Sequence, residues 1–200
     1  NIKGQGITIV NVNLIDITTN KQKSLFHKVY KNEEKVIDLL TISQDNKWLY
    51  FSEQNSGLGG YILFQTYPNL TKINLETKEK IQIFGTNGII KDYASISNIS
   101  KDGNLVSYFK GTKLFVYNVK DNKSTSFDIP YSGDYSCAGS AIFSNDNKSL
   151  AYNMANCNPE KEYVSIIFVD LDKNTQKNIY SGENGWIDGW LGEKILFHIT

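Results

Sequence analysis

A repeated turn pattern places the strongest constraint on what this chain can fold into. Each copy has a serine, an aspartate two residues later, an aliphatic residue six later and an aromatic residue eight later. The copies are Ser43–Phe51, Ser100–Tyr108 and Ser144–Tyr152. The Asp-Asn and Asp-Gly pairs within them tolerate positive φ or bond their own backbone, so each copy predicts a tight hairpin between two strands.

A second pattern lies between these copies and occurs four times. Each copy has alternating apolar residues, a polar turn and a return strand. The copies are Leu14–Lys21, Lys72–Glu79, Val116–Lys123 and Phe168–Thr175. The two hairpins alternate along the chain, and successive copies of the first begin 57 and 44 residues apart. A repeating unit of about 45 residues with four short strands predicts a β-propeller blade.

The expected fold class is therefore all-β, a β-propeller of four-stranded blades. With the strands of a blade named A to D from the centre outward, residues 7–27 supply a C–D pair. Three complete blades follow, and residues 186–189 and 194–199 supply a final A–B pair. Residues 1–200 form a single propeller domain or a propeller fragment. The ring is four-bladed if the two half-blades close it. Otherwise the chain is part of a six- to eight-bladed ring, and we favour this second arrangement because the chain stops inside a strand.

One segment is ambiguous. Residues 32–42 contain Val36, Ile37, Leu39 and Leu40, which also fit one face of a helix. Their place directly before a turn of the first type favours a strand.

The turn signature resembles the propeller repeat of TolB, which also occurs in the propeller domains of prolyl-oligopeptidase-type serine peptidases. The usual Ser-Pro-Asp-Gly-Lys form is altered here, with Gln44, Lys101 and Asn145 in place of the proline. The resemblance covers nearly the whole chain. It implies a scaffold for protein contact, ligand contact or substrate gating, commonly outside the cytoplasm.

Charge argues against a nucleic-acid partner. Lys and Arg total 21, as do Asp and Glu, so the chain lacks the basic excess that a nucleic-acid binder uses on phosphates. No apolar stretch approaches the roughly 18 residues that span a bilayer, so we expect no transmembrane segment.

The two cysteines flank the turn of the third blade. Antiparallel partners across that turn should have residue numbers that sum to 293 or 294, which places Cys137 nearly opposite Cys157. The alternatives are a disulfide, which implies an oxidising compartment, and two reduced cysteines in a cytosolic blade. We expect the disulfide. Two cysteines alone cannot form a structural zinc site, and His27 and His198 lie in other blades, so we expect no metal and no cofactor.

Aromatic residues cluster in and near the connections between blades. They are Tyr93, Tyr131, Tyr135, Trp186 and Trp190. Together with the B–C connections, these loops belong to one propeller face and form a candidate recognition surface. Packing between blades is the competing interpretation for each of these side chains.

Catalytic motifs are missing from the sequence. There is no Gly-x-Ser-x-Gly elbow, and the repeated aspartates are explained as turn formers. We therefore expect no enzyme but a binding or assembly module that contacts a protein or cell-envelope partner through one propeller face. We expect it outside the cytoplasm, in the periplasm, at the cell surface or secreted. The alternatives are a substrate-gating propeller of a larger serine peptidase and a structural subunit of a larger assembly.

Overall fold

The computed structural model describes residues 7–31, 33–55, 64, 66–90, 95–131, 137–156 and 163–199. These residues form sixteen β-strands and no helix. The strands are β1 (Ile7–Asp16), β2 (Lys21–Lys31), β3 (Lys35–Ile42), β4 (Trp48–Asn55), β5 (Leu70–Asn74), β6 (Lys80–Phe84), β7 (Ser95–Ile99), β8 (Leu105–Lys110), β9 (Lys113–Asn118), β10 (Lys123–Asp128), β11 (Cys137–Phe143), β12 (Ser149–Ala155), β13 (Tyr163–Asp170), β14 (Thr175–Glu183), β15 (Gly185–Leu191) and β16 (Lys194–Ile199).

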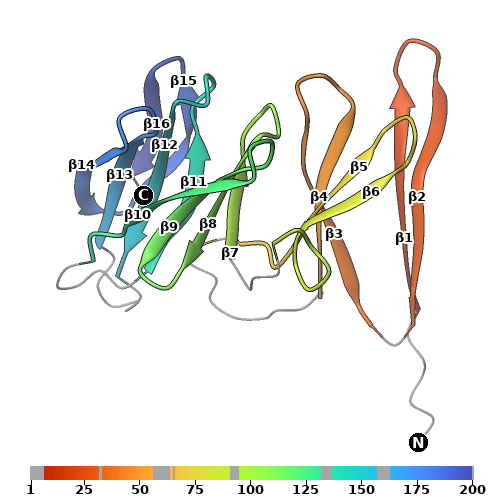
Figure 1. Cartoon of the computed structure of the whole chain (residues 1–200), viewed down its shortest axis with the longest axis horizontal. Coiled ribbons are helices and arrows are strands. Elements are labelled where there is room, and N and C mark those ends of the chain that lie inside the picture. The colour runs from red at the N-terminus through yellow and green to blue at the C-terminus, as the bar shows by residue number, and fades with distance from the viewer. Residues whose placement is uncertain are drawn as a thin grey trace, which may run out of the picture.

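The strands form five separate antiparallel sheets that follow one another along the chain (Figure 1). Blade 1 is β3–β6, blade 2 is β7–β10 and blade 3 is β11–β14, each with its strands hydrogen-bonded in chain order. The N-terminal half-blade is β1–β2 and the C-terminal half-blade is β15–β16. The expected all-β propeller blades are confirmed, and the ambiguous segment before the first turn is strand β3.

Asparagine and glycine shape the turns. In the A–B turns the residue after the aspartate has a positive φ of 55° at Asn46, 74° at Gly103 and 60° at Asn147. These residue types adopt the left-handed region most readily, so the hairpins can close tightly. The C–D turns likewise contain positive-φ residues, Asn20, Lys78, Asn122 and Asn174.

The core lies between the blades. Strand β12 is buried along nearly its whole length because both faces of its sheet are covered. Each boundary between successive sheets contains an apolar cluster. Blades 1 and 2 share one that includes Phe84 and Tyr108, and blades 2 and 3 share one that includes Phe109 and Tyr152. The fold is therefore stabilised mainly by packing of one sheet against the next.

Each first strand carries an irregularity. The register of the A–B pair shifts between Leu39 and Thr41 in blade 1, and equivalent shifts occur in β7, β11 and β15. An extra residue at such a position bends and twists the strand locally.

None of the described residues belongs to a helix that could cross a bilayer.

Candidate binding site

The A–B turns are held by a side-chain network that repeats in all three blades. The Ser43 hydroxyl donates to Asp45 Oδ1 at 2.6 Å and accepts from the Trp48 amide at 3.0 Å. The same serine–aspartate bond is 2.6 Å long in the other two copies, Ser100–Asp102 and Ser144–Asp146. Each aspartate also accepts from a backbone amide two residues later. One carboxylate oxygen of each aspartate is thus committed to the turn.

These hydrogen bonds extend the ionised range of the turn carboxylates to lower pH. Hydrogen bonds from Ser43 and from the Lys47 amide lower the pKa of Asp45 below its ordinary value of 3.8, and Asp146 behaves alike. Burial raises the pKa of Asp102, but hydrogen bonds from Ser100 and Asn104 outweigh it and the net shift is downward. All three aspartate side chains therefore carry a negative charge at neutral pH and for some distance below pH 4.

Asp102→Asn tests this charge. Because the folded pKa of Asp102 is depressed, its ionised form contributes stability above the unfolded pKa of about 3.9, and that contribution disappears as pH falls through the folded pKa. We expect the wild-type protein to exceed the variant in free energy of unfolding at pH 7, with the gap closing below about pH 4. Urea titrations at a series of pH values measure it. A gap that stays constant down to the acid limit would contradict this assignment.

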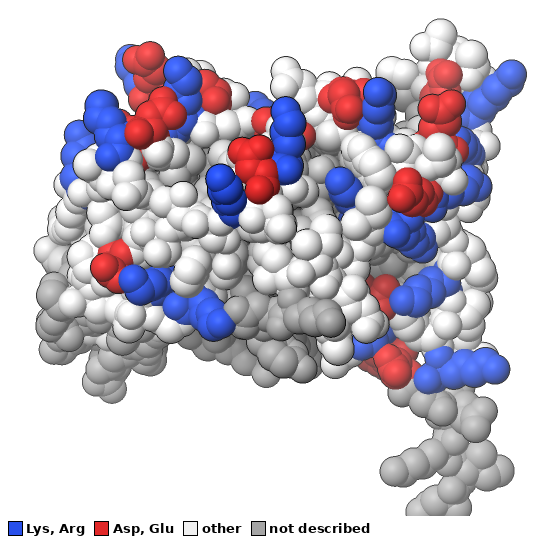
Figure 2. Space-filling view, in the orientation of Figure 1, with Lys and Arg blue, Asp and Glu red and all other residues white. Residues whose placement is uncertain are grey.

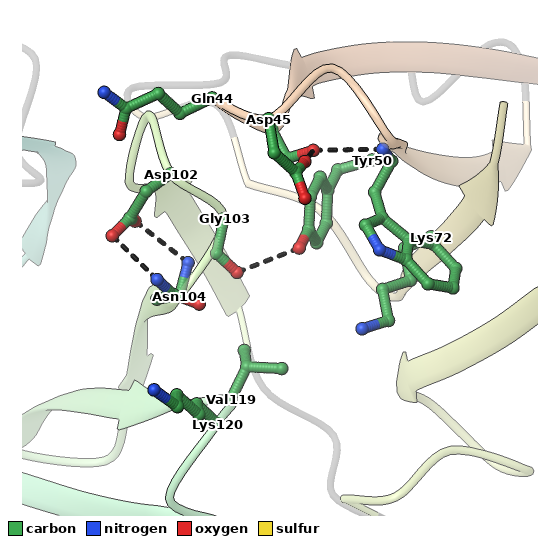
Figure 3. A pocket seen from close by; sticks show the side chains of 11 residues that line it. Gln44, Asp45, Tyr50, Lys72, Asp102, Gly103, Asn104, Val119 and Lys120 are labelled. Carbon is green, nitrogen blue, oxygen red and sulfur yellow. Dashed lines mark hydrogen bonds between the residues drawn. The ribbon is translucent and has the colours of Figure 1, made fainter.

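A groove opens between two of these turns. It has a volume of about 580 Å³ and lies between the A–B turn of blade 1 and the A–B and C–D turns of blade 2. Figure 3 shows Lys72 on one side, Val119 and Lys120 on the other, and the Asp45 and Asp102 carboxylates nearby. Two carboxylates and two amines thus line the same space.

The wall of the groove is built from tyrosine and tryptophan. The Tyr50 hydroxyl donates to the Gly103 carbonyl oxygen at 3.0 Å, which ties β4 of blade 1 to the turn of blade 2 (Figure 3). Burial, with the nearby carboxylates of Asp102 and Asp45, raises the pKa of Tyr50 to about 12, so the hydroxyl keeps its proton. The Lys72 amine lies 4.4 Å from the centre of the Trp48 ring. Such a cation–π contact holds the lysine side chain along the wall.

Gly103 leaves the space that Tyr50 fills. A Cβ at this position would lie 2.4 Å from the Tyr50 hydroxyl oxygen, and the backbone already has a positive φ of 74°. Glycine is therefore required here by both the backbone and its neighbour.

The aromatic residues expected on the loop face are distributed differently. Tyr131 packs against the core between blades 2 and 3, and the Trp190 indole donates to the Ile142 carbonyl oxygen at 3.0 Å. The Trp186 ring lies 5.9 Å from the Phe64 ring. Trp186 and Trp190 lie near opposite ends of β15, so one face does not collect both. Tyr93 and Tyr135 lie outside the described residues, and the recognition role of the set stays a prediction.

The cysteine register differs by a small amount from expectation. Cys137 pairs with Ala155, a sum of 292, because the register shifts between Gly139 and Ile142. The described part of the chain contains no free cysteine. Cys157 lies outside the described residues, so the Cys137–Cys157 disulfide stays a prediction.

The groove was not predicted from the sequence. Its charged residues come from neighbouring blades and are separated by up to 75 residues, from Asp45 to Lys120. The one available signal was the repeated Ser-x-Asp turn, which marks where adjacent turns meet. Within the described ranges, no group of three or more His, Cys, Asp or Glu side chains is placed to hold a metal ion.

No protein-family model and no curated protein sequence matches the chain. Solved structures do match. An oligogalacturonate lyase in complex with manganese has a TM-score of 0.59 at 13% identity, over 98% of this chain and 55% of that one. The Porphyromonas gingivalis dipeptidyl peptidase 4 has a TM-score of 0.55 at 11% identity, over 93% of this chain and 34% of that one. TolB from Acinetobacter baumannii has a TM-score of 0.50 at 14% identity, over 88% of this chain and 38% of that one.

The fold is that of a β-propeller. The resemblance to TolB-type propellers expected from the turn motif is confirmed at the level of fold. The chain spans about half of the oligogalacturonate lyase and a smaller share of the other two. At these identities the likeness concerns the fold alone.

Proposed function

We propose that this chain is a non-catalytic binding module that contacts a protein or cell-envelope partner through one propeller face. The observation that carries the proposal is the groove between blades 1 and 2. Its volume of about 580 Å³ falls within the range of about 300–1,000 Å³ typical of ligand sites. The turns that line the groove are held by side-chain hydrogen bonds and by rigid sheets, which lowers the entropic cost of binding.

The chemistry of the groove favours a polar partner segment with both signs of charge. Lys72 and Lys120 can pair with carboxylates, whereas Asp45 and Asp102 can pair with amines or guanidinium groups. The mixture continues beyond the groove: on the face in Figure 2, lysines and acidic residues alternate along the upper rim. An exposed peptide segment of a protein partner has this chemistry.

A photo-crosslinking amino acid at position 120 tests the proposal in the source cells. We expect a discrete adduct with one partner, and at least a tenfold loss of that adduct when Lys72→Glu reverses the charge across the groove. The matched control is the same probe at position 148, because Lys148 is an exposed residue of the blade 3 turn and does not line the groove. Equal adducts from both positions, or none from either, would contradict the assignment. Enzymatic turnover of a substrate by the protein, if a single point mutation abolished it, would also contradict the assignment.

A propeller that gates substrate access in a larger serine peptidase is the second candidate. The observation in its favour is the fold likeness to dipeptidyl peptidase 4. It predicts an α/β-hydrolase domain encoded in the same gene, so the flanking coding sequence separates the two candidates.

We further propose that the protein is located outside the cytoplasm. The support is the fold likeness to TolB together with the lack of a free cysteine in the described residues. We expect a thiol reagent to add nothing to the unfolded, unreduced protein and two groups after reduction, as read by intact mass. Two groups added before reduction would show that both cysteines are free thiols. This result would contradict the disulfide and the argument for an oxidising compartment.

A further inference from the structure

A second pocket lies at the boundary between the N-terminal half-blade and blade 1. It has a volume of about 410 Å³ and is lined by side chains of β2, β4, β5 and β6, together with Asn69 and Asn87. It shares no lining residue with the groove between blades 1 and 2, and none of its lining residues comes from β1 or β16. The pocket therefore belongs to the packing of one sheet against the next and is separate from the first groove.

The repeat shows that this boundary departs from the packing between blades 2 and 3. Counted along the repeat, Glu53 of β4 corresponds to Met154 of β12. Thr71 of β5 corresponds in the same way to Ile167 of β13. Met154 and Ile167 are buried in the apolar cluster between blades 2 and 3, whereas Glu53 and Thr71 line the pocket. Polar groups at a position that elsewhere builds the core sacrifice apolar burial, which is typical of a functional site.

The lysine of this pocket is particular to blade 1. The position of Lys80 is occupied by uncharged residues in the other copies of the repeat, Gln22, Ser124 and Gln176. The Gln176 amide donates to the Asp128 carbonyl oxygen and so ties blade 3 to blade 2. The Lys80 amine instead lies 4.2 Å from the centre of the Phe26 ring, and no oxygen of the described residues accepts a hydrogen bond from it.

The charges that line the pocket leave Lys80 without a counter-ion. The Lys28 amine donates to both oxygens of the Glu53 carboxylate, at 2.8 and 2.7 Å, so these two charges compensate each other. Partial burial, together with the positive charge of Lys28, lowers the pKa of Lys80. The surroundings therefore disfavour the charged amine, and a bound anion would remove this penalty.

We propose that this pocket binds a small organic monocarboxylate whose carboxylate group pairs with the Lys80 amine. One cation without a counter-ion matches one negative charge. The Glu53 carboxylate lines the same pocket and repels a doubly charged anion such as phosphate more strongly than a singly charged one. A charge-assisted hydrogen bond from a lysine to a carboxylate is about twice as strong as a neutral one.

Neutral groups complete the lining and define the rest of the ligand. The Thr71 hydroxyl and the Gln82 amide can each donate a hydrogen bond to the carboxylate. The rings of Phe26 and Phe51, with centres 5.1 Å apart, supply apolar surface. A pocket of about 410 Å³ with apolar walls and a few polar groups is typical of small-molecule sites. A carboxylate with a compact apolar body fits this lining.

Benzoate and benzamide are the matched probes, because they have nearly the same shape and differ in charge. Titration of the ¹⁵N-labelled full chain, followed by amide chemical shifts, measures their binding. We expect saturable shifts at Phe26, Lys80 and Gln82 with millimolar benzoate, and at least tenfold weaker binding of benzamide. Lys80→Gln should weaken benzoate binding about tenfold, since it removes the charged partner and leaves a neutral donor.

Lys78→Asn is the control, because it removes one positive charge from the same turn and Lys78 does not line the pocket. Both substitutions introduce residues that the repeat already uses, since the counterparts of Lys78 are Asn20, Asn122 and Asn174. Both variants should therefore fold, and benzoate affinity should be unchanged in Lys78→Asn. The proposal would be overturned by benzoate shifts that do not saturate, by equal binding of benzamide, by an equal loss in both variants, or by tighter binding of inorganic phosphate than of benzoate.

Discussion

Replacing Phe84 with alanine is expected to lower the free energy of unfolding by about 3–5 kcal/mol, the usual range for removing a buried aromatic ring. Phe84 is fully buried at the end of blade 1. Its ring centre lies 5.1 Å from that of Tyr108 and 5.7 Å from that of Tyr117, both in blade 2. The substitution therefore leaves a cavity at the boundary between two blades, where three rings pack edge to face.

Urea denaturation followed by tryptophan fluorescence measures this effect. Ile89→Ala is the matched control, because it removes an exposed apolar side chain close by in sequence and should change stability by less than about 0.5 kcal/mol. A loss at Phe84 no larger than at Ile89 would contradict the importance of this boundary.

Asn153→Leu is expected to cost about 2–5 kcal/mol, because it leaves two buried backbone groups without partners. The Asn153 side chain is fully buried in β12. Its amide donates to the Gly185 carbonyl oxygen at 2.9 Å, and its carbonyl oxygen accepts from the Ile187 amide at 3.2 Å. Leucine has a similar volume, so the expected loss comes from the missing hydrogen bonds and not from a cavity.

Ser97→Ala provides a graded comparison. The Ser97 hydroxyl accepts a single hydrogen bond, 2.8 Å long, from the Ala141 amide across the boundary of blades 2 and 3. Removing it should cost about half as much as Asn153→Leu, since one buried donor is orphaned and not two groups. Equal stability of the Asn153 variant and the wild-type protein in thermal unfolding would show that the backbone finds other partners.

Local sequence patterns predicted the strands well because each hairpin contains its own signals. The return strands expected after the C–D turns of blades 1 and 2 are β6 and β10. The segment before Ser43 was harder, because Val36, Ile37, Leu39 and Leu40 fit either periodicity. In the structure this segment pairs with β4 and is therefore a strand and not a helix.

Register and site geometry were less predictable. The shift between Gly139 and Ile142 moves the partner of Cys137 by one to two positions. The groove has a similar origin. It depends on how far one sheet turns relative to the next, which brings Lys72 and Lys120 to the same space although they belong to different repeats.

The contact between Tyr50 and Gly103 also limits how this repeat can change over time. At the next boundary the residue equivalent to Tyr50 is Ser107, and the residue equivalent to Gly103 is Asn147. At the boundary of blades 1 and 2 a large side chain, Tyr50, is matched with a glycine. At the boundary of blades 2 and 3 a small side chain, Ser107, is matched with an asparagine. An averaged repeat with asparagine in every turn would collide with the Tyr50 ring, so substitutions at these positions must occur as coordinated pairs across neighbouring units. Successive blades are therefore matched in sequence to their neighbours and cannot be exchanged freely.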